Sequence, residues 1–232
     1  MIFKRLIGLD ILKGLAVLLM IIYHFFFDLH YFQYLQIDFL DTFWQAFRYL
    51  IVSLFLFSVG VSLVLAHREK IHLHKVIKRF VLLGIAAFSV SIISYFLFPN
   101  SWIYFGILHF IWAASLLALA VLFHPKIALI LAVFIWLATF LGLSDSLWFS
   151  ALQPQILPYS SQDFVPIFPW LATVFLGISI ARFGWHQQLF SLLIWSKLPA
   201  HKGLAYLGKY ALWVYLIHQP ILFAGFYIFA YL

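Results

Sequence analysis

Long apolar stretches separated by short polar segments dominate the pattern along the chain. A helix of about 20 residues crosses the ~30 Å hydrocarbon core of a bilayer, and seven stretches come close to that length. The spans are expected near residues 7–29, 46–66, 77–98, 103–123, 126–143, 165–183 and 206–230. The segment 187–198 is too short to span and is expected to be a helix lying in the membrane interface. The pattern therefore predicts an all-α integral membrane protein, a single seven-span bundle and one domain over residues 1–232.

Composition agrees with this assignment. Of the 232 residues, 66% are hydrophobic and 9% are charged, whereas a soluble domain has about 25% charged and 45–50% apolar residues. The excess apolar surface requires lipid. Cysteine is absent, which excludes disulfides, thiolate nucleophiles and cysteine-based zinc sites. The histidines of "HREKIHLHK" (67–75) lack the thiolate or carboxylate partners of a metal site, so no metal is expected.

The basic residues predict the orientation of the bundle. With the N-terminus in the cytoplasm, twelve of the fourteen Lys and Arg residues lie on the inner side; Lys13 is inside a span and Arg48 is outside. The run after Lys4 and Arg5 is too long for a cleaved signal peptide, so we expect an uncleaved first span. The net charge of +7 is thus a property of the inner face and does not indicate nucleic-acid binding. It either sets topology and contacts anionic lipid or also binds an anionic cytoplasmic ligand such as coenzyme A.

The first span carries ionisable residues where hydrocarbon disfavours them. At about 100° per residue, Asp10, Lys13, His24 and Asp28 share one arc of about 100° on the predicted helix. Ionisable side chains on one inward face of a membrane helix are candidates for function. His24 and Asp28 are four residues apart and can touch, and a carboxylate beside an imidazole raises its basicity. The other interpretation is a polar cluster that only holds helices together.

Two more histidines are expected at similar depths in other spans. His109 lies about seven residues below the outer surface, close in level to His24, and His218 lies near mid-membrane in "YLIHQP". Each alone is more often an interhelical hydrogen-bond partner than a catalyst. Together with His24 they predict a polar cavity lined from three spans, in which His109 and His218 polarise a carbonyl or position a substrate.

Five ordered blocks of the chain resemble a known family. They are "LDILKGLAVLLMIIYHFFFDL", "LFLFSVGVSL", "YFGILHF", "FPWLATVFLGISIAR" and "LGKYALWVYLIHQPIL". They are similar to the bacterial DUF1624 proteins, relatives of the catalytic domain of heparan-α-glucosaminide N-acetyltransferase within the transmembrane acyltransferases. In sugar O-acyltransferases of that superfamily, an arginine precedes a functional histidine by ten intervening residues. Lys13 and His24 keep that spacing, with lysine replacing arginine.

The resemblance implies a multi-pass acyltransferase of the bacterial inner membrane. Acetyl-CoA would be the cytoplasmic donor, its phosphates near Lys13, Arg79, Arg182 or Lys209, and no cofactor would be bound permanently. His24, oriented by Asp28, would deprotonate a sugar hydroxyl or amine of an envelope glycan or glycolipid, or carry the acetyl group itself. The loop 144–163 is expected to cover the route of the acceptor.

Two other functions remain open from the sequence. One is a small-molecule transporter or flippase, with the histidines as a proton relay and Lys13 at the substrate site; the paired repeats typical of transporters are not evident. The other is a non-catalytic assembly protein, in which the polar stripe of the first span docks a partner helix.

Overall fold

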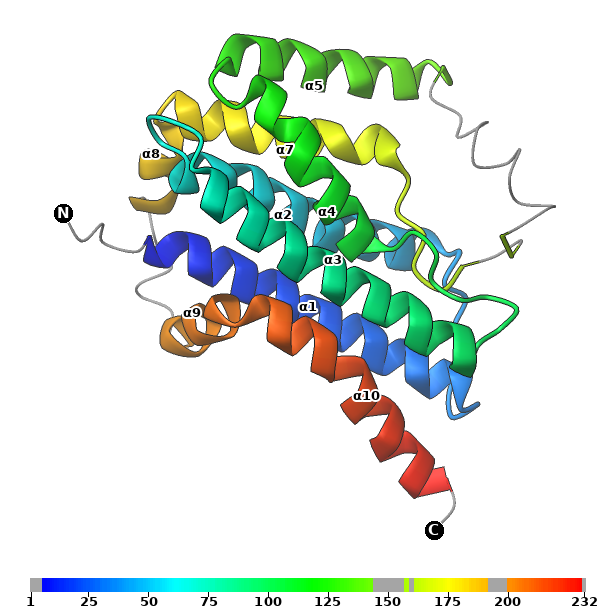
Figure 1. Cartoon of the computed structure of the whole chain (residues 1–232). Coiled ribbons are helices and arrows are strands. Elements are labelled where there is room, and N and C mark those ends of the chain that lie inside the picture. Colours follow the sequence, from blue (N-terminus) through cyan, green and yellow to red (C-terminus); the bar gives the residue numbers. More distant parts are fainter. Residues whose placement is uncertain (1–5, 144–156, 159–160, 192–199, 231–232) are drawn as a thin grey trace. The chain divides into compact units, whose positions relative to one another are not determined.

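The computed structural model describes residues 6–143, 157–158, 161–191 and 200–230, and their regular structure is helical, without strands (Figure 1). The helices, in chain order, are α1 (Ile7–Tyr31), α2 (Thr42–Ala66), α3 (Leu73–Leu97), α4 (Ile107–Leu117), the 3₁₀ turn η1 (Ala118–Val121), α5 (Pro125–Phe140), α7 (Ile167–Arg182), α8 (Trp185–Ser191), α9 (His201–Lys209) and α10 (Ala211–Ala230).

The apolar helices are those of a multi-pass membrane protein. In the described residues, α1, α2, α3 and α10 are long and apolar enough to cross a bilayer, and α4 with η1, α5 and α7 are shorter apolar helices. Large apolar side chains point away from the protein on several of them; Phe96 is 76% and Phe140 86% exposed. Such surfaces are covered by lipid. Each of these seven apolar helices overlaps one of the predicted stretches, while the number of crossings and the cytoplasmic N-terminus stay predictions.

The C-terminal stretch differs from the expected single span 206–230. Tyr210 has non-helical dihedral angles (φ −109°, ψ 22°), so the chain forms two helices, α9 ending at Lys209 and α10 beginning at Ala211. Helix α9 is short and amphipathic, and its buried residues are Leu204 and Gly208. The expected interfacial helix 187–198 corresponds in part to α8, and residues 192–199 lie outside the described residues. The same holds for most of the loop 144–163.

The chain divides into two compact units, with the boundary inside α2. The first unit comprises residues 1–55 and 188–232, and the second residues 56–187.

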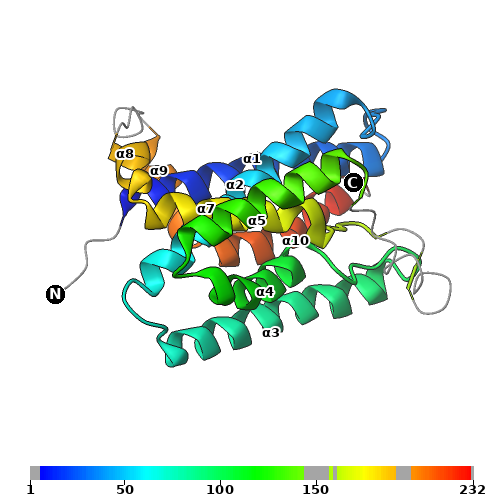
Figure 2. The same cartoon turned by 90° about the horizontal axis from the view of Figure 1, so that it is seen from above.

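In the first unit, α1 packs against α9 and α10 (Figures 1 and 2). Helices α1 and α9 approach so closely that a Cβ on Gly14 would overlap the carbonyl group of Leu204, and one on Gly208 would overlap that of Asp10. Such backbone contact needs glycine at the crossing point, as small-residue packing in membrane helices does. Helix α10 runs along the C-terminal half of α1 and brings its own polar residues to the stripe that begins at Asp10.

In the second unit, α3 packs against α4, and α5 packs against α7. The end of α2 crosses α7 at a second close approach, where Gly60 faces the backbone of Val174 and Gly177 faces the backbone of Phe57. The small-residue segment "FLFSVGVS" of α2 therefore serves helix packing. Trp112 of α4 ties its helix to α3, because its Nε1 donates to the carbonyl of Phe80 at 3.0 Å.

Candidate functional site

Two histidines meet at the contact between α1 and α10. The ring centroids of His24 and His218 are 4.9 Å apart, and the ring planes are inclined by 73°, an edge-to-face arrangement. His218 is buried, with 7% of its surface exposed, and His24 is half-buried. The inward stripe of α1 thus contacts a second imidazole from a helix nearly 200 residues away in the sequence.

The hydrogen bonds of these rings settle which nitrogen is protonated in the neutral form. Nδ1 of His24 lies 2.9 Å from the carbonyl oxygen of Met20, and Nδ1 of His218 lies 2.6 Å from that of Tyr215. A carbonyl oxygen can only accept, so both Nδ1 atoms carry the proton and both Nε2 atoms carry a lone pair. Each ring is therefore oriented by its own helix, with Nε2 as the basic, nucleophilic atom.

Asp28 contacts a residue that sequence reasoning missed. Its carboxylate is fully buried, and its Oδ1 accepts a hydrogen bond of 2.8 Å from Nε2 of Gln219. The expected contact with His24 is not the one that Asp28 makes. The signal for Gln219 was present, because it is a polar residue beside His218 in an otherwise apolar span.

Three buried polar atoms of this cluster have no hydrogen-bond partner within the described part of the chain. They are Oδ2 of Asp28, Oε1 of Gln219 and Nε2 of His218. All three are acceptors when the histidine is neutral and the aspartate ionised. Buried polar groups are paired in the great majority of cases, so an unpaired set of one polarity marks a place where a group with donor N–H or O–H atoms would be stabilised.

The two lysines of the expected donor site lie in the same unit. Lys13 is half-buried on α1, one turn after Asp10 and about 16 Å along the helix from His24. Lys209 ends α9, is exposed, and has its Nζ 5.1 Å from the centre of the Tyr210 ring. Because α9 packs on the first turns of α1, both cations belong to the same end of the unit.

His109, in the second unit, has both ring nitrogens engaged. Ser91 donates its single hydroxyl proton to the carbonyl of Ile103 at 2.6 Å, so Nε2 of His109, 3.0 Å from that hydroxyl oxygen, must be the donor of its pair. Nδ1 then accepts from the N–H of Gly106 at 3.3 Å. Asp163 accepts from the next N–H, that of Ile107, at 3.2 Å. The imidazole caps the start of α4 and ties it to α3.

Arg182 is likewise engaged with the backbone. Its Nε donates to the carbonyl of Leu122 at 2.7 Å, and its terminal nitrogens donate to the carbonyls of Arg68 and His67. Its guanidinium also lies 4.4 Å from the centre of the Phe123 ring. These carbonyls end α2 and η1, where helix dipoles favour a cation. Arg182 therefore joins the ends of three elements.

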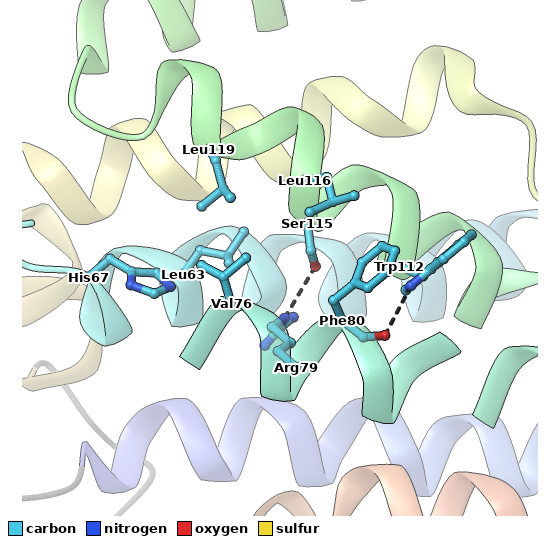
Figure 3. Close-up of a pocket in the computed structure, with 9 residues that line it drawn as sticks. All are labelled: Leu63, His67, Val76, Arg79, Phe80, Trp112, Ser115, Leu116 and Leu119. Atoms are coloured by element: carbon cyan, nitrogen blue, oxygen red, sulfur yellow. Dashed lines mark hydrogen bonds between the residues drawn. The ribbon is translucent and has the colours of Figure 1, made fainter. Parts of the chain in front are cut away.

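Arg79 instead lines a pocket between the end of α2, the start of α3 and the α4–η1 segment (Figure 3). The pocket is small, with a cavity volume of about 10 Å³, and it is partly open to its surroundings. Nε of Arg79 donates to the hydroxyl oxygen of Ser115 at 3.2 Å, the contact drawn in Figure 3. His67, Val76 and Trp112 are among its other lining residues.

The positive charge around this pocket affects His67, which follows the last residue of α2. Burial lowers the pKa of His67 from its usual 6.5, and the cationic neighbours His72, Lys75, Arg79 and Arg182 lower it further. The ring is therefore neutral at neutral pH, and its Nδ1 accepts a hydrogen bond of 3.2 Å from the N–H of His72.

The structure thus brings some of the expected residues together. His24, Asp28 and His218 lie in one cluster with Gln219, and Lys13 and Lys209 lie at one end of the same unit; His109, Arg79 and Arg182 belong to the other unit. Among the described residues, no group of three or more His, Cys, Asp and Glu side chains is placed to hold a metal ion. The cluster of His24, His218, Asp28 and Gln219 can accept a proton at Nε2 of either histidine, and unpaired acceptor oxygens of Asp28 and Gln219 lie in the same cluster.

Comparison with known proteins identifies the family. A sequence model described as "Heparan-alpha-glucosaminide N-acetyltransferase, catalytic" matches residues 5–220. That match includes α1, α2 and α10 as far as Pro220, and hence His24, His218 and Gln219. No curated protein and no solved structure gives a significant match. The match extends over nearly the whole chain, and the chain belongs to the heparan-alpha-glucosaminide N-acetyltransferase catalytic-domain family.

Proposed function

We propose that this membrane protein transfers the acetyl group of acetyl-CoA to a hydroxyl or amine of a cell-envelope sugar. The family is named for an N-acetyltransferase catalytic domain, which supports the reaction class. The observation that carries the choice of acceptor is the cluster of unpaired acceptor atoms on Asp28, Gln219 and His218 beside His24. Sugar hydroxyls and ammonium groups are rich in donors, and they complement such a cluster.

The two histidines supply the base. Nε2 of His24 accepts the proton of the attacking hydroxyl or amine as the new C–O or C–N bond forms and the C–S bond of the thioester breaks. The proton returns to the departing thiolate, which leaves as free coenzyme A. Two imidazolium charges with rings 4.9 Å apart repel each other strongly in a water-poor site, so the pair shares a single transferable proton.

His218 is better suited to hold the acceptor than to polarise the thioester. Its Nδ1–H is bound to the carbonyl of Tyr215, so its neutral Nε2 has no proton to donate to a carbonyl oxygen. It can accept a hydrogen bond from a neighbouring hydroxyl of the same sugar and so orient the attacking group toward the thioester. Asp28 and Gln219 position a second donor group of the same sugar.

The cations play a separate part. Lys13 and Lys209, at one end of the first unit, are the proposed contacts of the donor's phosphates, and the distribution of basic residues along the sequence supports a cytoplasmic location for that end. Arg182 and His109 are proposed to be structural, since their polar atoms already bond to backbone and serine groups. The protein would lie in the bacterial inner membrane and accept an acyl group from inside for a glycan outside.

Transfer of a labelled acetyl group to envelope glycans tests this proposal. Membranes containing the protein are incubated with acetyl-CoA labelled in the acetyl group, and envelope glycans are extracted and counted. Label should appear in the glycan fraction, be lost with His24→Ala, and persist with His124→Gln, because His124 is exposed and lies outside the cluster. If wild-type membranes transfer no label to any glycan, the proposed reaction is wrong.

The mass of the intact protein distinguishes the two possible routes. An acetyl adduct of about 42 Da after mixing with acetyl-CoA, absent from His24→Ala, indicates covalent transfer through the imidazole. Label transfer to the glycan without an adduct indicates direct attack by the acceptor.

A further inference from the structure

The Arg79 pocket differs from the histidine cluster in the polarity of its side-chain atoms. Its polar lining side chains are His67, Arg79, Trp112 and Ser115, and the remaining lining residues are apolar. No lining residue is acidic; Glu69, in the adjoining loop, is exposed and outside the pocket. A half-buried arginine with no carboxylate beside it is unusual, because a buried charge is normally paired.

The polar side-chain atoms that line the pocket without a partner among the described residues are hydrogen-bond donors. Arg79 uses Nε on Ser115, and its two terminal nitrogens have no partner among the described residues. Ser115 accepts that bond, and no described residue accepts its own hydroxyl proton. His67 accepts at Nδ1 from His72, so its neutral ring holds the proton at Nε2. The side-chain groups left over are therefore N–H and O–H donors.

The donors are held in place by the surrounding structure. Arg182 bonds to the carbonyls of His67 and Arg68 and so fixes the end of α2 beside the pocket. Trp112 bonds to the carbonyl of Phe80 and stacks on its ring at 4.7 Å, which fixes α4 against α3. A set of donors fixed before binding needs little ordering when a ligand arrives.

We infer that the pocket formed by Arg79, Ser115 and His67 binds a phosphate group attached to an apolar or amphiphilic molecule. A phosphate presents only acceptor oxygens, and an arginine fork binds two of them at once. The apolar side of the pocket, Leu63, Val76, Leu116 and Leu119, suits the hydrocarbon part that carries the phosphate. The inference does not depend on acetyl transfer, because the same chemistry is offered by an anionic phospholipid headgroup and by the phosphates of coenzyme A.

The experiment uses the purified full-length protein in lipid nanodiscs. Coenzyme A, which lacks the acetyl group, is titrated into nanodiscs of phosphatidylcholine alone, and binding is measured by calorimetry. In a parallel arm, native mass spectrometry counts phosphatidylglycerol molecules retained from mixed phosphatidylcholine–phosphatidylglycerol nanodiscs. The variants are Arg79→Gln, Arg79→Lys and Ser115→Ala. The control is Lys126→Gln, which removes one exposed positive charge from the same unit outside the pocket.

Arg79→Gln should weaken binding of one of the two probes by about tenfold or more, since charge-assisted bonds are lost. Arg79→Lys should recover part of that loss, Ser115→Ala should lose a few-fold, and Lys126→Gln should bind as wild type. Loss of coenzyme A alone assigns the site to a soluble phosphate donor, and loss of phosphatidylglycerol alone assigns it to a lipid headgroup. If Arg79→Gln and Ser115→Ala bind both probes as Lys126→Gln does, the site is refuted. Should Arg79→Gln fail to fold, Ser115→Ala and Arg79→Lys decide.

Discussion

Replacing Gly208 with alanine should push α9 away from α1. A Cβ at this position would lie 2.7 Å from the carbonyl carbon of Asp10 and 2.8 Å from the amide nitrogen of Gly14, and closer still to the Asp10 oxygen. These are backbone atoms that cannot rotate aside, so one helix must shift. Overpacking of this kind lowers stability by about 1–3 kcal/mol, and backbone contacts put Gly208→Ala at the upper end.

The same helix provides the control. Gly203 has nothing within 4 Å of its would-be Cβ, so Gly203→Ala should gain the helix propensity of alanine over glycine, about 0.8–1 kcal/mol. Gly208→Ala gains the same amount and loses about 3 kcal/mol to the clash, for a net loss of about 2 kcal/mol. The two variants should therefore differ by about 3 kcal/mol with opposite signs.

Unfolding of the full chain in mixed detergent micelles, followed by far-UV circular dichroism, measures both variants against wild type. The expected result is a higher midpoint for Gly203→Ala and a lower one for Gly208→Ala. Equal shifts of the same sign would refute the close crossing of α1 and α9, and with it the placement of Lys13 and Lys209 at one end of the unit.

Three further predictions use other parts of the structure. His109→Ala should lower the free energy of unfolding by about 1–3 kcal/mol in denaturant titrations, because it leaves buried polar groups unpaired. Adding Ser91→Ala to this variant should lower it little further, since the two residues share one hydrogen-bond network. Additive losses would contradict the role of His109 as the cap of α4. Burial and cationic neighbours lower the pKa of His67 in the folded chain, so stability is fully present above pH 6.5 and falls as the pH drops through the folded pKa; His67→Gln should flatten this decline in the thermal midpoint, and an unchanged slope would contradict it. Gln219→Leu leaves the buried carboxylate of Asp28 without its donor, so stability should fall by about 1–3 kcal/mol and the KM for the sugar acceptor should rise; an unchanged KM would remove Gln219 from the acceptor site.

The sequence predicted the helices well because lipid imposes a strong length and polarity rule. Each of the seven apolar helices among the described residues overlaps an expected stretch, with ends that differ by a few residues. The break at Tyr210 was missed because hydropathy averages over a window and does not detect a single non-helical residue. The sequence also did not indicate that Gly14 and Gly208 lie at the crossing of α1 and α9. A close approach depends on which helix lies opposite, and one helix's own sequence does not show that.

The histidine cluster was predicted only in outline. The arc shared by Asp10, Lys13, His24 and Asp28 follows from the 3.6-residue period alone. Neither the contact of Asp28 with Gln219 nor that of His24 with His218 follows from spacing, because both partners come from α10, nearly 200 residues away. Depth in the membrane can be read from one sequence, but the rotation of one helix against another cannot.

The sequence does not distinguish polar residues that serve a functional site from polar residues that hold helices together. Histidine and arginine are common in catalytic and binding sites. The sequence gives no sign that the nitrogens of His109 bond to Ser91 and Gly106, or that those of Arg182 bond to carbonyls at helix ends. Backbone acceptors and donors are present at every position, so a side chain that binds them leaves no mark in the pattern.

A double-mutant cycle on His24 and His218 tests the central claim most directly. The rate of acetyl transfer from acetyl-CoA to envelope glycan is measured for wild type, His24→Ala, His218→Ala and the double variant, all checked for folding. If the pair acts as one proton-transferring unit, each single variant loses at least about 10²-fold, and the double variant loses no more than the worse single one. Losses that multiply, or a wild-type rate in either single variant, would contradict it.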